Sequence, residues 1–120
     1  QLNTIHGLFE VCEGVWQVRG YDISNLTLIA GKSGWILVDV LTTAATASAC
    51  LALANQTLGE RPVVAVIYTH SHADHFGGIK GVTTAEEVAT GKVRIIAPEG
   101  FLFLKCHGFQ LFPWKPNFAS

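Results

Sequence analysis

The sequence predicts an α/β fold in one small domain, and three observations support that prediction. Apolar, β-branched runs of strand length occur at residues 25–30, 35–40 and 62–68. One run with helical periodicity, residues 43–58, lies between the last two of them. The chain has 120 residues, of which 49% are hydrophobic, so it can form a single small core. Strands that alternate with helices are typical of a layered α/β domain.

The amino-terminal region is predicted to be all strand. Residues 8–19 indicate two short strands that turn at Glu13-Gly14. The next two runs indicate a β-hairpin around the turn "GKSG". A phosphate-binding loop is rejected at this turn, because it needs a glycine five positions before Gly31, where the chain has Leu26. Such a loop also leads into a helix, whereas a strand pattern follows here.

The helix predicted over residues 43–58 has a continuous apolar face. Thr42 or Thr43 can cap its start, and Gly59 and Pro62 end it. Its apolar face is made by residues at spacings of four, three and four, namely Ala47, Leu51, Ala54 and Leu58.

The second half of the chain continues the alternation of strand and helix. Residues 62–68 form a continuous apolar run, so we expect a strand with both faces buried. Residues 83–90 predict a short helix capped by Thr83 or Thr84, and residues 92–98 predict a further strand.

Composition excludes some functions. The formal net charge is −1 and no Lys/Arg cluster is present, which argues against nucleic-acid binding. No apolar run approaches the roughly 20 residues of a transmembrane helix. Because the chain starts at Gln1 and has no Met, we expect a processed product or a piece of a longer protein, and its compartment stays undecided.

Several residues that could bind metal stand alone in the sequence. Cys12, Cys50 and Cys106 are far apart and form no CxxC pair, so we interpret them as small buried apolar residues. His6 and His107 are likewise interpreted as structural or exposed.

The segment "IYTHSHADHFGG" carries the clearest functional signal. His70, His72, Asp74 and His75 form an H-x-H-x-D-H motif directly after the apolar run, and two glycines follow. Imidazole nitrogens and carboxylate oxygens are preferred ligands of zinc. His70 and His72 point the same way in an extended segment and can share one ion, while Asp74 and His75 can face a second ion. The end of such a strand is also where open α/β sheets place their sites.

Asp39 stands at the end of the run 35–40 and needs a polar partner. One interpretation is that Asp39 does not bind the metal itself but supports a histidine that does. The alternative is a cap or turn contact for the segment that begins at Thr42. The sequence leaves both open.

The motif and its flanks resemble a known family. H-x-H-x-D-H after a buried strand, with Asp39 at an earlier strand end, is similar to the metallo-β-lactamase superfamily. The stretches "GVWQVRGYDISNLTLIAGKSGWILVD", "GERPVVAVIYTHSHADHFGGIKGV" and "IIAPEGF" resemble the amino-terminal part of alkyl sulfatases that hydrolyse dodecyl sulfate. The resemblance covers residues 1–101 and implies about half of an αββα sandwich, with a partial domain over 1–100.

The resemblance also implies a site and a chemistry. The complete protein would be a zinc-dependent hydrolase of long-chain alkyl sulfate esters with two Zn²⁺ ions. His70 and His72 would bind one ion, Asp74 and His75 the other, and Asp74 would orient the metal-bound water. The remaining ligands would come from beyond residue 120. The resemblance further implies a homodimer and allows a periplasmic or secreted location in bacteria.

A non-catalytic interpretation is kept beside the enzyme. The chain could be a truncated metal-binding or association module, or belong to another hydrolase of the same fold, such as a thioesterase or lactamase. Nearby groups that could complete the ligand set are few, and the family does not use them so: Glu86, Glu87, Glu99 and His107. We therefore expect residues 1–120 alone to lack sulfatase activity.

The last segment, residues 101–120, departs from the family pattern. It holds five of the seven Phe and no acidic residue, where the alkyl sulfatases continue with a polar, acidic helix. A segment this apolar must pack against something. It is interpreted as a divergent tail, either an alternative ending or an out-of-frame read.

Overall fold

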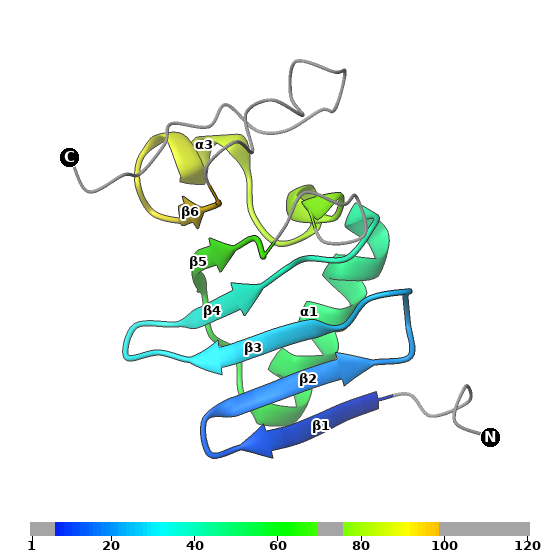
Figure 1. Cartoon of the computed structure of the whole chain (residues 1–120). Coiled ribbons are helices and arrows are strands. Elements are labelled where there is room, and N and C mark those ends of the chain that lie inside the picture. The colour runs from blue at the N-terminus through cyan, green and yellow to red at the C-terminus, as the bar shows by residue number, and fades with distance from the viewer. Residues whose placement is uncertain (1–6, 70–75, 99–120) are drawn as a thin grey trace.

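The computed structural model describes residues 7–69 and 76–98, and these build one sheet with helices on one side (Figure 1). In chain order the elements are β1 (Gly7–Cys12), β2 (Val15–Arg19), β3 (Leu26–Ala30), β4 (Trp35–Val38), α1 (Ala44–Leu58), β5 (Val63–Ile67), the 3-10 helix η2 (Ile79–Gly81), α3 (Ala85–Ala89) and β6 (Arg94–Ile96). The predicted α/β class and the predicted order of elements are confirmed.

The six strands lie in the sheet in the order in which they occur in the chain. The first four form an antiparallel meander, and β4, β5 and β6 run parallel to one another. Helix α1 connects β4 to β5 and packs behind the sheet in the view of Figure 1. The carboxyl ends of β4 and β5 therefore meet at one edge, because parallel strands end on the same side.

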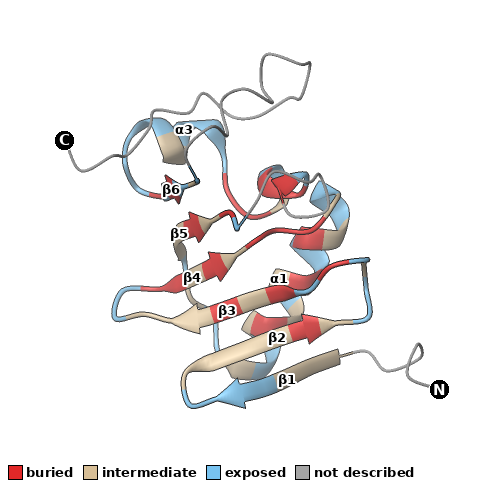
Figure 2. Cartoon of the chain, in the orientation of Figure 1, coloured by how far each residue is buried: buried red, intermediate tan, exposed pale blue. Residues whose placement is uncertain are grey.

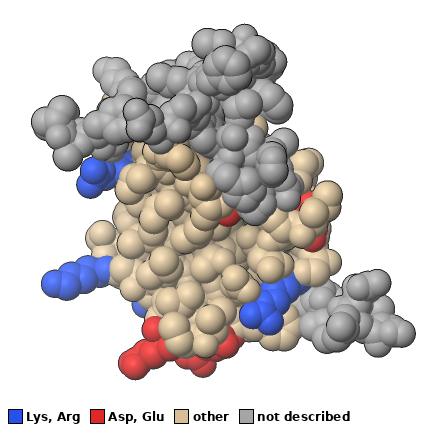
Figure 3. Space-filling view, viewed as in Figure 1, with Lys and Arg blue, Asp and Glu red and all other residues tan. Residues whose placement is uncertain are grey.

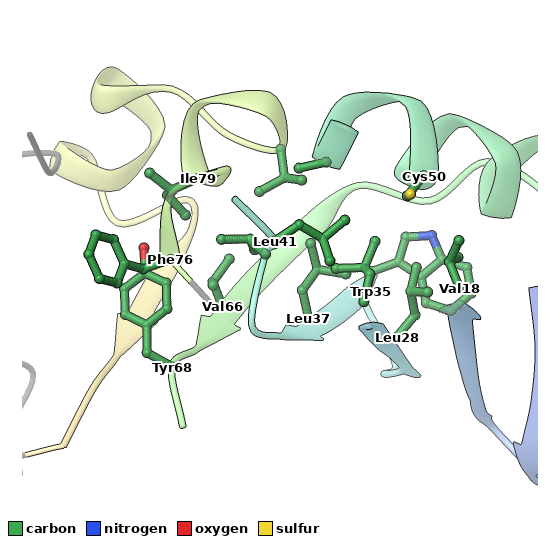
Figure 4. Close-up of a cluster of buried hydrophobic side chains, with 14 of the residues drawn as sticks. Val18, Leu28, Trp35, Leu37, Leu41, Cys50, Val66, Tyr68, Phe76 and Ile79 are labelled. Carbon is green, nitrogen blue, oxygen red and sulfur yellow. The ribbon is translucent and has the colours of Figure 1, made fainter. Parts of the chain in front are cut away.

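The core lies between the sheet and α1 (Figures 2 and 4). Strand register places Leu28 opposite Leu37, and Leu37 opposite Val66, so one face of the sheet carries the buried aliphatic side chains. Buried residues of α1 meet this face, namely Ala47, Cys50 and Ala54. The apolar face predicted for the helix is confirmed, with Cys50 added to it.

The opposite face of the sheet is only partly covered, and it is polar over β2 and β3, where Gln17 bonds to Thr27, and apolar over β5. Within β5, Val66 is buried and the other four residues of the strand are half-buried. The expectation that both faces of this strand are buried is therefore wrong for the described residues. A continuous apolar run predicts burial on both sides, but it cannot supply the layer that covers the second side. Ile96 of β6 is 41% exposed on this face. Charged side chains gather at its margins and leave the area over the middle strands uncharged (Figure 3).

Both predicted helix starts are confirmed, with one cap chosen from each pair. The Thr43 hydroxyl accepts a hydrogen bond from the Thr46 backbone N–H at 3.2 Å, so Thr43 rather than Thr42 caps α1. Thr84 caps α3 in a capping box with Glu87. Gly59 ends α1 with a positive φ of 101°, which a glycine adopts without strain.

Four strands are shorter than predicted, and β3 loses only the first residue of its run. β4 ends at Val38 rather than at residue 40, because Asp39 has a φ of 60° and leaves the extended conformation. β5 and β6 each lose the residues at both ends of their predicted runs. The turn "GKSG" leads into β4, which agrees with the rejection of a phosphate-binding loop.

The prediction of buried cysteines is confirmed at Cys50 and wrong at Cys12. Cys50 lies in the core, and burial raises the pKa of its thiol, with a smaller contribution from Asp22. Cys12 ends β1 beside a register shift at the edge of the sheet, where its side chain is exposed. Cys106, His6 and His107 lie outside the described residues.

The end of the sheet away from the motif is fixed by Trp35. Its side chain is fully buried, and its indole N–H donates to Asn55 Oδ1 at 2.7 Å. The Arg61 guanidinium lies 5.1 Å from the Trp35 ring centre. Trp16 meets the same ring edge-on at 5.8 Å.

Asn55→Ala is expected to destabilise the protein by about 1–3 kcal/mol, because the buried indole N–H of Trp35 loses its acceptor. Urea unfolding of the full-length protein, followed by circular dichroism, measures the change. Gln56→Ala is the matched control, since Gln56 is the exposed neighbour on the same helix. Equal unfolding midpoints for both variants would contradict a stabilising hydrogen bond between Trp35 and Asn55.

Candidate metal centre

The H-x-H-x-D-H motif falls on residues 70–75, outside the described residues, so the ligand roles of His70, His72, Asp74 and His75 stay predictions. Among residues 7–69 and 76–98, no group of three or more His, Cys, Asp or Glu could hold a metal ion. What the structure gives is the frame on either side of the motif. Thr69 precedes it at the end of β5, and Phe76 follows it.

The leading end of the motif is held by Asp39. This side chain is 6% exposed, and its carboxylate accepts two hydrogen bonds from Thr69: one from the backbone N–H at 2.8 Å and one from the hydroxyl at 2.7 Å. The Asp39 N–H in turn donates to the Ile67 carbonyl at 2.8 Å, just beyond the last paired residues of β4 and β5. The residue next to the motif is thus fixed through both backbone and side chain.

The trailing end of the motif is held by Gly78. Its N–H donates to the Leu41 carbonyl at 2.9 Å. A Cβ atom on Gly78 would lie 2.0 Å from the Val40 carbonyl oxygen and 2.7 Å from that of Thr43. Only glycine therefore fits at this contact, and the chain after the motif lies directly on the backbone of residues 40–43.

One short segment thus holds both ends of the motif. We call residues 39–43 the support segment. Two of its non-glycine residues have positive φ, 60° at Asp39 and 67° at Leu41. Such conformations cost about 1–3 kcal/mol each and persist only where surrounding contacts impose them. Two hydrogen bonds are contacts of this kind: one joins Thr69 to the Asp39 side chain, and the other joins the Gly78 N–H to the Leu41 carbonyl.

Two aromatic rings bring the ends of the motif together. Tyr68 and Phe76 are both buried, and their ring centres lie 6.3 Å apart in an edge-on arrangement (Figure 4). Burial raises the pKa of the Tyr68 hydroxyl, and the nearby Asp39 charge adds to the shift.

The sequence prediction left one alternative for Asp39 that the structure corrects. Asp39 accepts two hydrogen bonds from Thr69, which follows β5, and Thr42 donates its hydrogen bonds to Asp22 instead. The contact from Asp22 was missed by sequence reasoning. The signal available was only an aspartate within the loop "YDISN", which is a common turn residue and gives no indication of a distant partner.

The other acidic candidates do not strengthen the ligand set. Glu87 accepts from the Thr83 hydroxyl at 2.8 Å and from the Thr84 N–H at 3.1 Å, and these bonds lower the pKa of its carboxyl group. Its place is therefore in the cap of α3. Glu86 is exposed, and Glu99 lies outside the described residues, as does His107.

The donor set itself fits a divalent metal. Three imidazoles and one carboxylate within six positions are the ligand types of zinc, and they stand between two ends fixed on one segment. None of the described helices is long and apolar enough to cross a membrane.

A family model described as "Metallo-beta-lactamase superfamily" matches residues 19–119. An (R)-specific secondary-alkylsulfatase of Pseudomonas sp. is 53% identical over 102 residues, which are 85% of this chain and 15% of that protein. The chain therefore spans less than a sixth of the length of this relative.

The structure of this chain is also similar to solved structures of an alkylsulfatase and of metallo-beta-lactamases. The stereoselective inverting sec-alkylsulfatase of Pseudomonas sp. matches with a TM-score of 0.83 and 52% identity, over 86% of this chain and 16% of that one. A metallo-beta-lactamase of Erythrobacter litoralis, solved in a mono-zinc form, matches with a TM-score of 0.56 and 27% identity, over 78% of this chain and 44% of that one.

Proposed function

The chain belongs to the metallo-β-lactamase superfamily, and on that premise we propose that it is the amino-terminal part of a hydrolase of alkyl sulfate esters. The reaction adds water across the ester and gives an alcohol and sulfate. The observation that carries the proposal is the 53% identity to the secondary-alkylsulfatase over 102 residues. The similarity includes the strands and helix that form the frame of the motif as well as the motif itself.

We propose zinc as the metal, with two ions in the complete protein. His70 and His72 would hold one ion, and Asp74 and His75 the other. The mono-zinc form of one structural neighbour and the donor chemistry support zinc. When bound, zinc would lower the pKa of a coordinated water and so provide the hydrolytic water of the reaction. Asp74 is proposed to orient that water, and the complete protein is proposed to be a homodimer.

The described residues would serve this chemistry by position. Asp39 holds Thr69 at one end of the motif, and Gly78 places the other end on the support segment. Because the residues on both sides of the motif are held in place, we propose that the segment between them loses less conformational freedom when the metal binds. The remaining ligands and the substrate pocket are proposed to come from outside residues 1–120.

The proposal is tested by comparing substrates. The full-length protein is expected to release sulfate from dodecyl sulfate or a secondary alkyl sulfate and to leave a β-lactam such as nitrocefin largely intact. Residues 1–120 expressed alone, with excess zinc, are expected to release no sulfate, since each proposed ion would lack at least one ligand. Lactam hydrolysis without sulfate release by the full-length protein would move it to another branch. Sulfate release by residues 1–120 would show that Glu86, Glu87, Glu99 or His107 completes the site.

A further inference from the structure

Asp22 forms hydrogen bonds to its neighbour Ile23 and to Thr42, which lies far from it in the chain. It lies in the loop between β2 and β3, and its carboxylate accepts three hydrogen bonds. Oδ2 accepts from the Thr42 N–H at 2.9 Å, while Oδ1 accepts from the Thr42 hydroxyl at 3.0 Å and from the Ile23 N–H at 2.6 Å. Both groups of Thr42, 20 residues away, thus bind one carboxylate.

Thr42 is the position at which this contact has most effect. It belongs to the support segment and directly follows Leu41, which has a φ of 67° and whose carbonyl accepts from Gly78. Thr43 caps α1 on its other side. Asp22 therefore fixes the support segment from outside, while Asp39 and Gly78 connect the same segment to the two ends of the motif.

The carboxylate is suited to this role in a way that an amide is not. Asp22 offers acceptors only, and its three partners here include two backbone N–H groups, one on each oxygen. An asparagine would place an NH₂ group against one of those N–H groups in either orientation. A negative charge next to the start of α1 is also favourable, because the amino end of a helix is partly positive.

We propose that Asp22 is a positioning residue for the metal centre, acting through Thr42 on the support segment and so on both ends of the H-x-H-x-D-H motif. This rests on the metal site of the proposed function but not on the identity of its substrate. It assigns to the β2–β3 loop a part in metal binding although that loop contributes no ligand to the motif.

Zinc affinity and the visible spectrum of the cobalt-substituted, full-length protein test the proposal. Asp22→Asn is expected to weaken zinc binding about tenfold, at the lower end of the effect of residues that support metal ligands, and to change the cobalt d–d bands. Thr42→Val is expected to do the same to a lesser extent, because it removes only the hydroxyl bond. Thr42→Ser keeps both donors and is expected to retain the wild-type affinity and spectrum.

Glu13→Gln is the matched control, since it neutralises an exposed carboxylate in the β1–β2 turn, at the other end of the sheet. If Asp22→Asn lowers only the unfolding temperature and leaves affinity and spectrum unchanged, Asp22 is merely structural and the proposal fails. If Asp22→Asn does not fold, the contrast between Thr42→Val and Thr42→Ser decides in the same way. Failure of the wild type to bind zinc would overturn the metal site itself as well as this role.

Discussion

Gly78→Ala is expected to be the most damaging of the substitutions next to the motif. The added Cβ would lie 2.0 Å from the Val40 carbonyl oxygen, 2.7 Å from the Thr43 carbonyl oxygen and 2.8 Å from Ala47 Cβ. Two of these are backbone atoms of the support segment, so they cannot turn aside as a flexible side chain would. We expect a loss of about 3 kcal/mol in the free energy of unfolding, at the upper end of the usual cost of overpacking.

The same substitution should also weaken the metal site. Relief of the clash requires the chain after residue 75 to move away from the support segment, and the Gly78–Leu41 hydrogen bond would lengthen. We expect zinc affinity to fall at least tenfold, measured by competition with a chromophoric chelator. Ala45→Ser, an exposed change in the first turn of α1, is the control and should alter neither quantity. A Gly78→Ala protein with wild-type stability and affinity would show that the contact with residues 40–43 is not formed.

After Gly78→Ala, Asp39→Ala is expected to cause the second-largest loss of stability among the substitutions next to the motif. It removes the acceptor of both Thr69 hydrogen bonds, and it leaves alanine at a φ of 60°, a conformation that aspartate tolerates better. Thr69 is exposed, so water can replace part of the loss, and we expect about 2 kcal/mol of destabilisation. Activity on an alkyl sulfate should fall 10–100-fold, the usual effect of a residue that supports metal ligands.

Asp39→Asn tests how much of this loss comes from the hydrogen bonds, because asparagine can still bond to Thr69 but carries no charge. Its amide oxygen can accept from the Thr69 N–H, and the Thr69 hydroxyl can rotate to accept from the amide. We expect less than half of the stability loss of Asp39→Ala, measured by urea unfolding. Equal stability of wild type and Asp39→Ala would argue against the link between β4 and β5 at this edge.

The sequence was sufficient to predict the elements of the fold and their order. The hairpin around "GKSG", the helix ending at Gly59 and the motif after the run 62–68 all depend on local patterns, which a single sequence displays. Asp39 was identified because a carboxylate at the end of an apolar strand needs a partner. Its partner was not, since Thr69 comes into contact only through the pairing of β4 with β5.

What could not be predicted depends on contacts between distant segments. No local pattern relates Asp22 to Thr42, or shows that Gly78 must be glycine because of Val40 and Thr43. The positive φ of Leu41 is unexpected for a bulky side chain and follows from its surroundings rather than from its own preference. The partial burial of β5 has the same origin, because an apolar run does not indicate what covers each of its faces.

The zinc content of the purified full-length protein tests the central claim most directly. We expect the wild type to retain zinc after gel filtration and a His70→Ala/His72→Ala variant to lose at least the ion assigned to those two residues, as measured by elemental analysis. His6→Ala, a histidine outside the motif, is the control and should retain the wild-type content. Equal zinc content in the wild type and the double variant would contradict a metal centre at the H-x-H-x-D-H motif.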